Sequence, residues 1–224
     1  VDLELELVRA GADRIGQAML AAGSGIFIAD AETDGDLHCL VKAARATGIH
    51  LLCGSAGLAR ALQEVAAFEP TAERRDLPFM EAGPVLIVAG SQHPQTARQV
   101  ELAAKQGVEV VRPDGTGVGD MQNGAVDAIV GHMRAGRHAV LSTVGMDLAP
   151  LDAQEIAAYL GRLVGQVLKQ VVVGGLVLTG GDIAMAICTA LESTALWLHG
   201  EIEPGIPYGR LAGGEYSGLP VVTK

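Results

Sequence analysis

The chain has 224 residues, of which 49% are hydrophobic and 19% are charged, and its formal net charge is −10. This much apolar material supports a packed core and excludes a disordered chain. An acidic balance without a basic stripe argues against nucleic acid as a partner. Any anionic ligand must then be held by local features such as helix N-termini, because the overall charge repels it.

The three cysteines, Cys39, Cys53 and Cys188, match neither a disulfide framework nor the spacing of a zinc site. Their pattern favours a reducing, cytoplasmic setting. No apolar stretch is long enough to span a membrane without charges or turn residues, and no leader pattern opens the chain, so we expect no membrane partner. The first residue is Val rather than Met, and we expect the chain to be part of a longer protein.

The first third of the sequence alternates between helical and strand patterns. The expected order is a helix through residues 3–20, a strand at 26–30, a helix at 36–47, a strand at 49–53 and a helix at 55–68. The acidic residues between 30 and 36 could cap the following helix, bind a cation or simply be solvated. Residues 69–83 carry charges and two prolines without a period, which is typical of a linker.

A longer alternation follows the linker. Strands are expected at 85–89, 108–111, 138–143, 176–179, 196–203 and 219–223, and helices at 95–106, 121–135, 152–173 and 182–191. The pattern Asp-x-x-Glu at 152–155 predicts a capping box at the start of the longest helix. We therefore predict an α/β fold, a layered α/β/α arrangement with a largely parallel sheet, plus a smaller N-terminal α/β portion.

Three loops share one layout, a buried strand, a turn of small residues and a helix, at 51–57, 87–94 and 177–182. A helix that follows a parallel strand points its free N–H groups toward the carboxyl edge of the sheet, and glycine lets a phosphate approach the backbone. The plainer interpretation is that these residues only make tight turns. No Walker loop or Gly-x-Gly-x-x-Gly follows a strand, and the nearest pattern, at 115–119, has the wrong spacing and no lysine. This argues against a P-loop enzyme and an ordinary dinucleotide fold.

Several polar residues near these loops allow two interpretations. Asp182 could cap its helix, or hold a metal ion that bridges phosphates. Residues 201–209 predict a rigid loop after a strand, and Glu201 and Glu203 could bind a cation or be solvated. His93 could act as a general acid or contact phosphate, although a surface histidine in a turn is the simpler interpretation.

Four motifs, read together and in order, resemble the nucleotide-binding C-terminal domain of the four-carbon acid sugar kinases. They are Gly-Ser-x-x-Pro-x-Thr at 90–96, Leu-Thr-Gly-Gly-Asp at 178–182, Glu-Ile-Glu-Pro-Gly-Ile-Pro-Tyr-Gly at 201–209 and Leu-Pro-Val-Val-Thr-Lys at 219–224. The segments at 28–37 and 53–59 resemble the closing portion of the family's N-terminal domain. The resemblance implies three parts: the end of an acid-sugar-binding domain at 1–68, a linker at 69–83 and a nucleotide-binding domain at 84–224.

The resemblance also implies a function. Members of the family are kinases that use ATP to phosphorylate four-carbon sugar acids of the threonate, erythronate or 3-oxo-tetronate type, and we expect Mg²⁺ to bridge the phosphates. Carried over by motif, the nucleotide contacts are Ser91, Gly180, Gly181, Asp182, Ile183, Pro204, Gly205 and Pro207, with Asp182 also as the metal ligand.

Some parts of the family pattern are absent from this sequence. The N-terminal Asp-Asp segment and a Gly-Gly-Phe-Gly segment after Thr-Lys are missing, so we expect the general base to lie outside this chain. The partners would be a small sugar acid and, in a homo-oligomer, further copies of the protein. Two alternatives remain, a non-catalytic nucleotide- or anion-binding module and, less favoured, an oxidoreductase that binds a dinucleotide.

Overall fold

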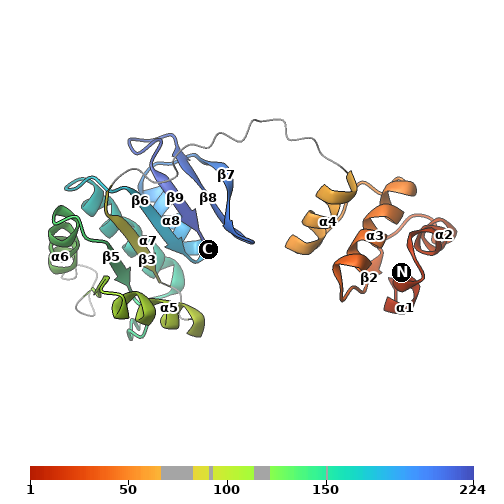
Figure 1. Cartoon of the computed structure of the whole chain (residues 1–224), viewed down its shortest axis with the longest axis horizontal. Helices are drawn as coiled ribbons and strands as arrows, with labels where there is room; N and C mark the ends of the chain where they lie inside the picture. Colours follow the sequence, from red (N-terminus) through yellow and green to blue (C-terminus); the bar gives the residue numbers. More distant parts are fainter. Residues whose placement is uncertain (67–82, 91–92, 114–121, 150) are drawn as a thin grey trace. The chain divides into compact units, whose positions relative to one another are not determined.

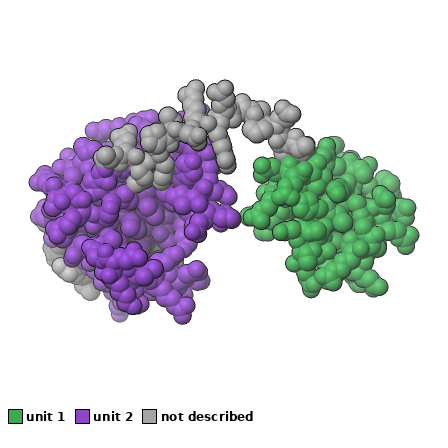
Figure 2. Space-filling view, in the orientation of Figure 1, with its two compact units in different colours: residues 1–73 green, residues 74–224 purple. Residues whose placement is uncertain are grey.

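The computed structural model describes residues 1–66, 83–90, 93–113, 122–149 and 151–224. The chain divides into two compact units, unit 1 (Val1–Glu73) and unit 2 (Arg74–Lys224), which have separate colours in Figure 2. Almost all of the predicted linker at 69–83 and the whole glycine-rich loop at 115–119 lie outside the described residues. None of the described helices is both long enough and apolar enough to cross a membrane.

Unit 1 is a small α/β body. Its elements are β1 (Asp2–Leu3), α1 (Leu5–Arg9), α2 (Ala12–Ala22), β2 (Ile28–Ala29), α3 (Asp34–Ala46) and α4 (Ala56–Ala66), with β1 and β2 paired in parallel. The single helix predicted through 3–20 is wrong: β1 comes first, and the helical part breaks at Gly11, whose φ of 100° a helix cannot contain. The strand predicted at 49–53 is also wrong, since this segment has no strand pairing and Leu51 is 89% exposed.

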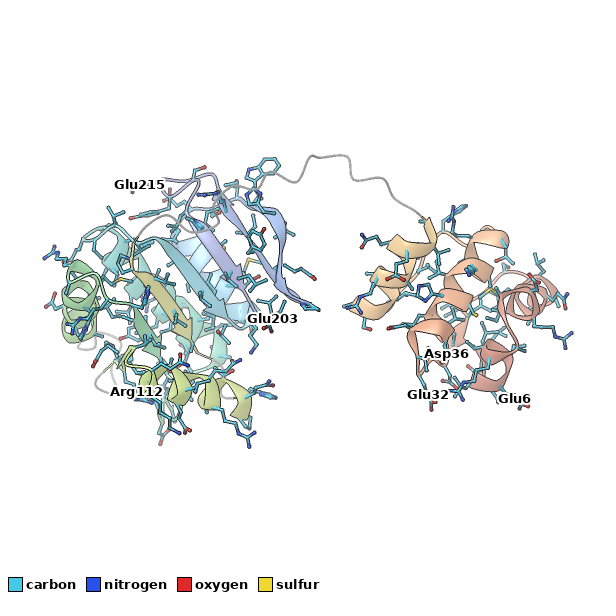
Figure 3. All side chains as sticks on the ribbon, viewed as in Figure 1. Glu6, Glu32, Asp36, Arg112, Glu203 and Glu215 are labelled. Atoms are coloured by element: carbon cyan, nitrogen blue, oxygen red, sulfur yellow. The ribbon has the colours of Figure 1, made fainter. Side chains whose placement is uncertain are left out.

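The acidic turn of unit 1 caps α3, as one of its three interpretations proposed. The Thr33 side chain accepts a hydrogen bond from the Asp36 N–H, and the Asp36 carboxylate accepts from the N–H groups of Thr33 at 2.9 Å and Glu32 at 3.0 Å. Arg9 forms an ion pair with Glu32 at 2.6 Å. The hydrogen bond from the Glu32 backbone is the main cause that lowers the pKa of Asp36. Figure 3 shows Glu32 and Asp36 at the same end of the unit.

Unit 2 is built on a seven-stranded sheet in the order β4-β5-β3-β6-β9-β8-β7 (Figure 1). The strands are β3 (Val85–Ala89), β4 (Glu109–Val111), β5 (Ala139–Ser142), β6 (Gly175–Thr179), β7 (Ala195–Glu203), β8 (Ile206–Ala212) and β9 (Pro220–Thr223). The five strands from β4 to β9 in this order are parallel, and β8 and β7 add an antiparallel edge. The largely parallel sheet that the sequence predicted is therefore confirmed.

Helices cover both faces of this sheet. They are α5 (Pro94–Lys105), α6 (Gln122–Arg134), α7 (Ala153–Leu168) and α8 (Gly181–Ala190). The residues of α6, α7 and α8 share one core cluster with Leu86 and Val88 of β3, whereas α5 packs with Ile87 and Ala89 on the other face. Alternate residues of one strand thus face two helical layers, which confirms the α/β/α layering.

The longest helix of unit 2 starts as the sequence predicted but ends earlier. At the start of α7 the Asp152 carboxylate accepts from the Glu155 N–H at 2.8 Å, and the Glu155 carboxylate accepts from the Asp152 N–H at 2.9 Å. This reciprocal pair is the predicted capping box. The helix ends at Leu168 rather than residue 173, because three valines after residue 170 extend the apolar pattern without continuing the helix.

The rigid loop predicted at 201–209 is wrong, because this stretch is the end of a β-hairpin. Strands β7 and β8 pair through most of it, and only Pro204 and Gly205 form the turn. The φ of Gly205 is 81°, as the third position of a turn with proline before it requires. The Glu201 carboxylate accepts a hydrogen bond from the Gly205 N–H at 3.3 Å, so one of the two predicted carboxylates supports the turn.

Candidate functional site

Two of the three predicted loops meet at the carboxyl edge of the sheet. Strands β3 and β6 are parallel neighbours in register, with Ala89 opposite Thr179, and each is followed by a helix. A Cβ on Gly90 would lie 2.6 Å from Cδ1 of Ile183, so glycine is needed for the first loop to approach the start of α8. Ser91, the contact predicted from this loop, lies outside the described residues. The third loop, at 51–57, belongs to unit 1.

The start of α8 presents unused hydrogen-bond donors. Gly180, with a φ of 104°, is the N-cap residue, and its own N–H donates to the Lys224 carbonyl at 2.7 Å. Gly181, Asp182 and Ile183 then form the first turn, whose N–H groups have no partner inside a helix. No described residue accepts a hydrogen bond from these three groups. Three aligned donors and the positive end of the helix dipole are features that suit a turn to anion binding.

The site residues of this turn contribute in different ways. The side chain of Ile183 is only 6% exposed and packs in the core, so its N–H alone can reach a ligand. Asp182 does not cap α8 as one interpretation proposed, since it is the second residue of the helix and makes no capping hydrogen bond. Its carboxylate is exposed and makes no hydrogen bond or ion pair with any described residue.

No group of three or more His, Cys, Asp or Glu side chains within the described ranges could hold a metal ion. Mg²⁺ in nucleotide sites needs fewer protein ligands, because phosphate oxygens and waters complete its shell around one or two carboxylates. The exposed carboxylate of Asp182, in the same turn as the three unused N–H groups, suits that kind of site.

A pocket of about 580 Å³ opens beside the first turn of α8, a volume in the range of small-molecule sites. Its described lining residues are Gly180, Gly181, Ala184, Met185, Cys188, Ser193, Thr194, Ala195, Leu196, Gly205, Pro207, Thr223 and Lys224. The structure thus brings together four of the residues predicted as nucleotide contacts: Gly180, Gly181, Gly205 and Pro207. Pro204, Asp182 and Ile183 lie next to lining residues along the chain but do not line the pocket themselves.

Sequence reasoning missed the apolar wall of this pocket. Met185 and Cys188 extend the wall along α8 from the glycines, and Leu196 at the start of β7 also lines the pocket. Burial raises the pKa of the Cys188 thiol, so this group packs as a neutral side chain. A signal was present in the sequence, because the residues of α8 after Asp182 are apolar apart from Thr189, which leaves apolar side chains outside the core.

His93 has a structural role in the other loop. It is the N-cap residue of α5, and its Nδ1 accepts a hydrogen bond from the Gln95 N–H at 3.2 Å. Pro94 at the first helical position needs no such partner, because proline has no N–H. This arrangement supports the simpler interpretation of His93 as a turn residue.

Curated relatives of this chain are kinases by name. A D-threonate kinase of Bordetella bronchiseptica is 34% identical over 211 residues, which cover 92% of this chain and 50% of that protein. A D-threonate kinase of Salmonella typhimurium is 34% identical, with 96% of this chain and 54% of that protein covered. A D-erythronate kinase of Heliobacterium modesticaldum is 25% identical, with 92% and 51% covered. The chain spans about half the length of the curated relatives it matches.

Solved structures have a similar fold. A Bordetella bronchiseptica domain of unknown function, solved with bound citrate as a domain-swapped dimer, matches with a TM-score of 0.54 and 30% identity, covering 100% of this chain and 53% of that chain. A structure from Salmonella typhimurium matches with a TM-score of 0.70, covering 100% and 56%, and at 13% identity it shows the fold alone.

One family model matches most of unit 2. It is described as the nucleotide-binding C-terminal domain, and it matches residues 86–224. The matched range contains the first turn of α8, the pocket beside it and every residue predicted as a nucleotide contact. Because this range is more than half of the 224 residues, the chain belongs to the family of the nucleotide-binding C-terminal domain.

Proposed function

We propose that the full-length protein is an ATP-dependent kinase of a four-carbon sugar acid, and that this chain supplies most of its ATP-binding part. The curated relatives named as D-threonate, D-erythronate and 3-oxo-tetronate kinases support this proposal. Each of these names denotes a kinase of a small sugar acid. The acid that this protein accepts is one of these three types.

The observation that carries the proposal is the first turn of α8. Its three unused N–H groups lie beside a pocket large enough for a nucleotide. In this proposal the triphosphate binds at Gly181, Asp182 and Ile183 through the backbone, and Gly180 shapes the turn. We propose Ser91 as a further phosphate contact, because Gly90, the residue before it, packs against the side chain of Ile183 in the first turn of α8.

The adenine base packs along the apolar wall of the pocket. From Gly181 to Cys188, α8 rises by about 10 Å, which carries a ligand from the phosphate turn to the apolar wall. Met185 and Cys188 cover one side of the base, and Pro207 lines the pocket from the hairpin. Gly205 lines the pocket at the turn of the hairpin, and Pro204 precedes it in the chain. Burial of the flat face of an aromatic base is the contribution expected of such a surface.

Asp182 is the proposed ligand of Mg²⁺. The ion supplies charge neutralisation on the phosphates during transfer. The protein contributes by holding a carboxylate next to the three backbone donors, so that phosphate and metal ligands come from one turn of one helix. Positioning and charge stabilisation account for most of the catalysis in phosphoryl transfer.

The other parts of the proposal concern unit 1 and the setting of the protein. Residues 1–68 are the closing portion of the domain that binds the acid, residues 69–83 are the linker, and residues 84–224 are the nucleotide-binding domain. The free thiols Cys39, Cys53 and Cys188 suit the reducing cytoplasm. The domain-swapped dimer of the Bordetella structure supports a homo-oligomer, which light scattering of the full-length protein would test.

The test is a coupled assay of ADP release by the full-length protein with ATP, Mg²⁺ and threonate, erythronate or 3-oxo-tetronate. Acid-dependent ADP release supports the kinase and identifies its substrate. Tight ATP binding by calorimetry without turnover on any of the three acids would instead indicate a non-catalytic nucleotide-binding module. Absence of ATP binding with Mg²⁺ present would overturn the proposal.

A further inference from the structure

Strand β9 is followed by a lysine that lies next to the first turn of α8. We call this turn, Gly181 to Ile183, the phosphate turn, because it is the proposed site of the triphosphate. Strands β6 and β9 pair in parallel up to Leu178 and Thr223, and the pairing continues one residue further. The Lys224 N–H donates to the Leu178 carbonyl at 2.9 Å, and the Lys224 carbonyl accepts from the Gly180 N–H at 2.7 Å. The backbone of Lys224 is therefore fixed to the residues on both sides of Thr179, and the end of β9 lies beside the start of α8 (Figure 1).

The charge of the pocket depends on this residue. Among the described lining residues, Lys224 is the only charged one. Its ammonium group makes no ion pair with any carboxylate in the described part of the chain. The net charge of −10 opposes the approach of an anion, and the other lining groups are apolar or uncharged. Lys224 is exposed, so its ammonium group is solvated and open to an anionic ligand.

The phosphate turn lacks a positively charged side chain. Its donors are backbone N–H groups, and a helix N-terminus contributes only about half a positive charge. The Thr-Gly-Gly-Asp turn contains no lysine of its own, whereas P-loop proteins place a lysine within the loop to contact the outer phosphates. A lysine presented by the adjacent strand would supply the same charge from a different element.

We propose that Lys224 binds a phosphate group of the nucleotide and is the protein's cation at this site. This inference rests on the proposed function, because it assumes that the pocket binds a nucleotide. It adds a contact that the sequence motifs did not assign. The lysine binds phosphate, and the apolar wall binds the base, so the two contributions are separable.

The test uses the full-length protein and the variants Lys224→Ala and Lys224→Arg, with calorimetric titration of ATP, ADP and adenosine in Mg²⁺ buffer. Loss of a charge-assisted hydrogen bond weakens binding by roughly tenfold to a hundredfold. We expect Lys224→Ala to weaken ATP and ADP binding by this factor, to leave adenosine binding unchanged and to reduce the salt dependence of ATP binding. Lys224→Arg should retain most of the affinity.

The matched control is Lys169→Ala, a lysine that follows α7 and does not line this pocket. Because the hydrogen bonds of Lys224 use its backbone, Lys224→Ala should keep the melting temperature of the protein. Equal ATP affinity in wild type and Lys224→Ala, or an equal loss of ATP and adenosine affinity, would overturn the inference. If the wild-type protein itself binds no ATP, the proposed function fails first, and the two failures are thus distinguished.

Discussion

At the scale of single residues, the end of α8 holds a strained position. The Ser193 N–H donates to the Cys188 carbonyl at 2.9 Å and the Glu192 N–H to the Thr189 carbonyl at 3.1 Å, which together form a Schellman motif. Its left-handed position is occupied by Glu192, with a φ of 55°. This is the only non-glycine residue with positive φ among those described, and glycine is the usual residue there.

We expect Glu192→Gly to stabilise unit 2 by about 0.5–1 kcal/mol, because glycine removes the clash of Cβ in the left-handed conformation. The larger entropy of glycine in the unfolded chain offsets part of this gain. Glu192→Ala is the control, since it removes the carboxylate but keeps Cβ and should give no such gain. Urea unfolding measures both changes. Equal stabilisation by alanine and glycine would contradict the role of backbone strain.

The carboxylate of Asp182 gives a second prediction at this scale. Asp182→Asn keeps the size of the side chain but removes its charge, so we expect the full-length protein to need more Mg²⁺ for half-maximal rate and to lose at least tenfold in kcat. Stability should change little, because the side chain makes no capping hydrogen bond. An unchanged Mg²⁺ dependence of the rate would show that the metal is held elsewhere.

At the scale of elements, helix α7 approaches α8 closely at one glycine and not at another. A Cβ on Gly161 would lie 2.9 Å from the Ala186 carbonyl oxygen, whereas nothing lies within 4 Å of a Cβ on Gly165. Both glycines lie inside α7. Since the phosphate turn begins α8, the contact at Gly161 also sets the position of the proposed nucleotide site.

We therefore expect opposite effects from two like substitutions. Gly161→Ala pushes against a helix backbone and should destabilise the protein by about 1–3 kcal/mol and weaken ATP binding. Gly165→Ala should stabilise it by about 0.5–1 kcal/mol, because alanine favours the helix. Thermal unfolding and ATP titration of the two variants check this pair. Similar stability of both variants would mean that α8 can move away at little cost.

In unit 1, a histidine connects two helices in a manner that depends on pH. His38 of α3 contacts the Asp34 carbonyl through Nδ1 and the Glu64 carboxylate of α4 through Nε2. Both partners are acceptors, so both ring nitrogens must donate, and this requires the protonated ring. The hydrogen bond to the Asp34 backbone and then that to Glu64 raise the pKa of His38 above its ordinary value.

Because the folded pKa is raised, the contribution of His38 is complete below its unfolded pKa and is lost as pH rises through the folded pKa. We expect α4 to exchange its amide hydrogens faster at pH 8.5 than at pH 5.5, after correction for intrinsic rates. His38→Gln should remove most of this difference. The control is His50→Gln, at an exposed histidine outside the helices, which should leave the difference unchanged. The same pH dependence in His38→Gln would place its cause in another group.

The elements also show what the sequence could predict. Strand β3 lies at the predicted residues because its continuous apolar run is buried between two helical layers. The strand prediction at 49–53 was wrong because a strand also needs a neighbouring strand to complete its hydrogen bonds, and no described strand pairs with this segment. Strand β8 was missed because the two prolines and two glycines of this stretch indicated a loop rather than a hairpin. Gly209 lies within the strand because a Cβ at this position would lie 2.1 Å from the Trp197 carbonyl oxygen.

Some residues of the candidate site could be predicted from a local sequence pattern, and others could not. Gly180 and Gly181, the proposed phosphate-binding glycines, form a short pattern within one loop, so the sequence alone could point to this turn, which lines the pocket. Lys224 was not, because its closeness to Gly180 depends on the pairing of two strands that lie more than 40 residues apart in the chain. Contacts of this kind follow from sheet topology rather than from any local pattern.

At the scale of the whole molecule, each unit has its own core. Unit 1 packs around Leu3, Val8, Ile15, Met19 and Ala43, and no residue of this cluster belongs to the clusters of unit 2. The proposed nucleotide site lies entirely in unit 2. A ligand that binds only the folded form of one unit stabilises that unit by mass action, by about 2.7 kcal/mol at a concentration one hundred times its Kd.

We therefore expect ATP with Mg²⁺ to protect the 224-residue chain unevenly. Amide exchange should slow in the strands and helices of unit 2, most strongly at α8, and should change little in α2 and α3 of unit 1. Adenosine should give weaker protection that is concentrated along the wall of the pocket rather than at the phosphate turn. The turn and part of the wall belong to one helix, so amide exchange can be compared within α8. ATP should slow exchange at Gly181 to Ile183, whereas adenosine should slow it mainly at Met185 to Cys188. Protection of unit 1 equal to that of unit 2 would mean that the nucleotide couples both units, and that part of its site lies outside residues 84–224.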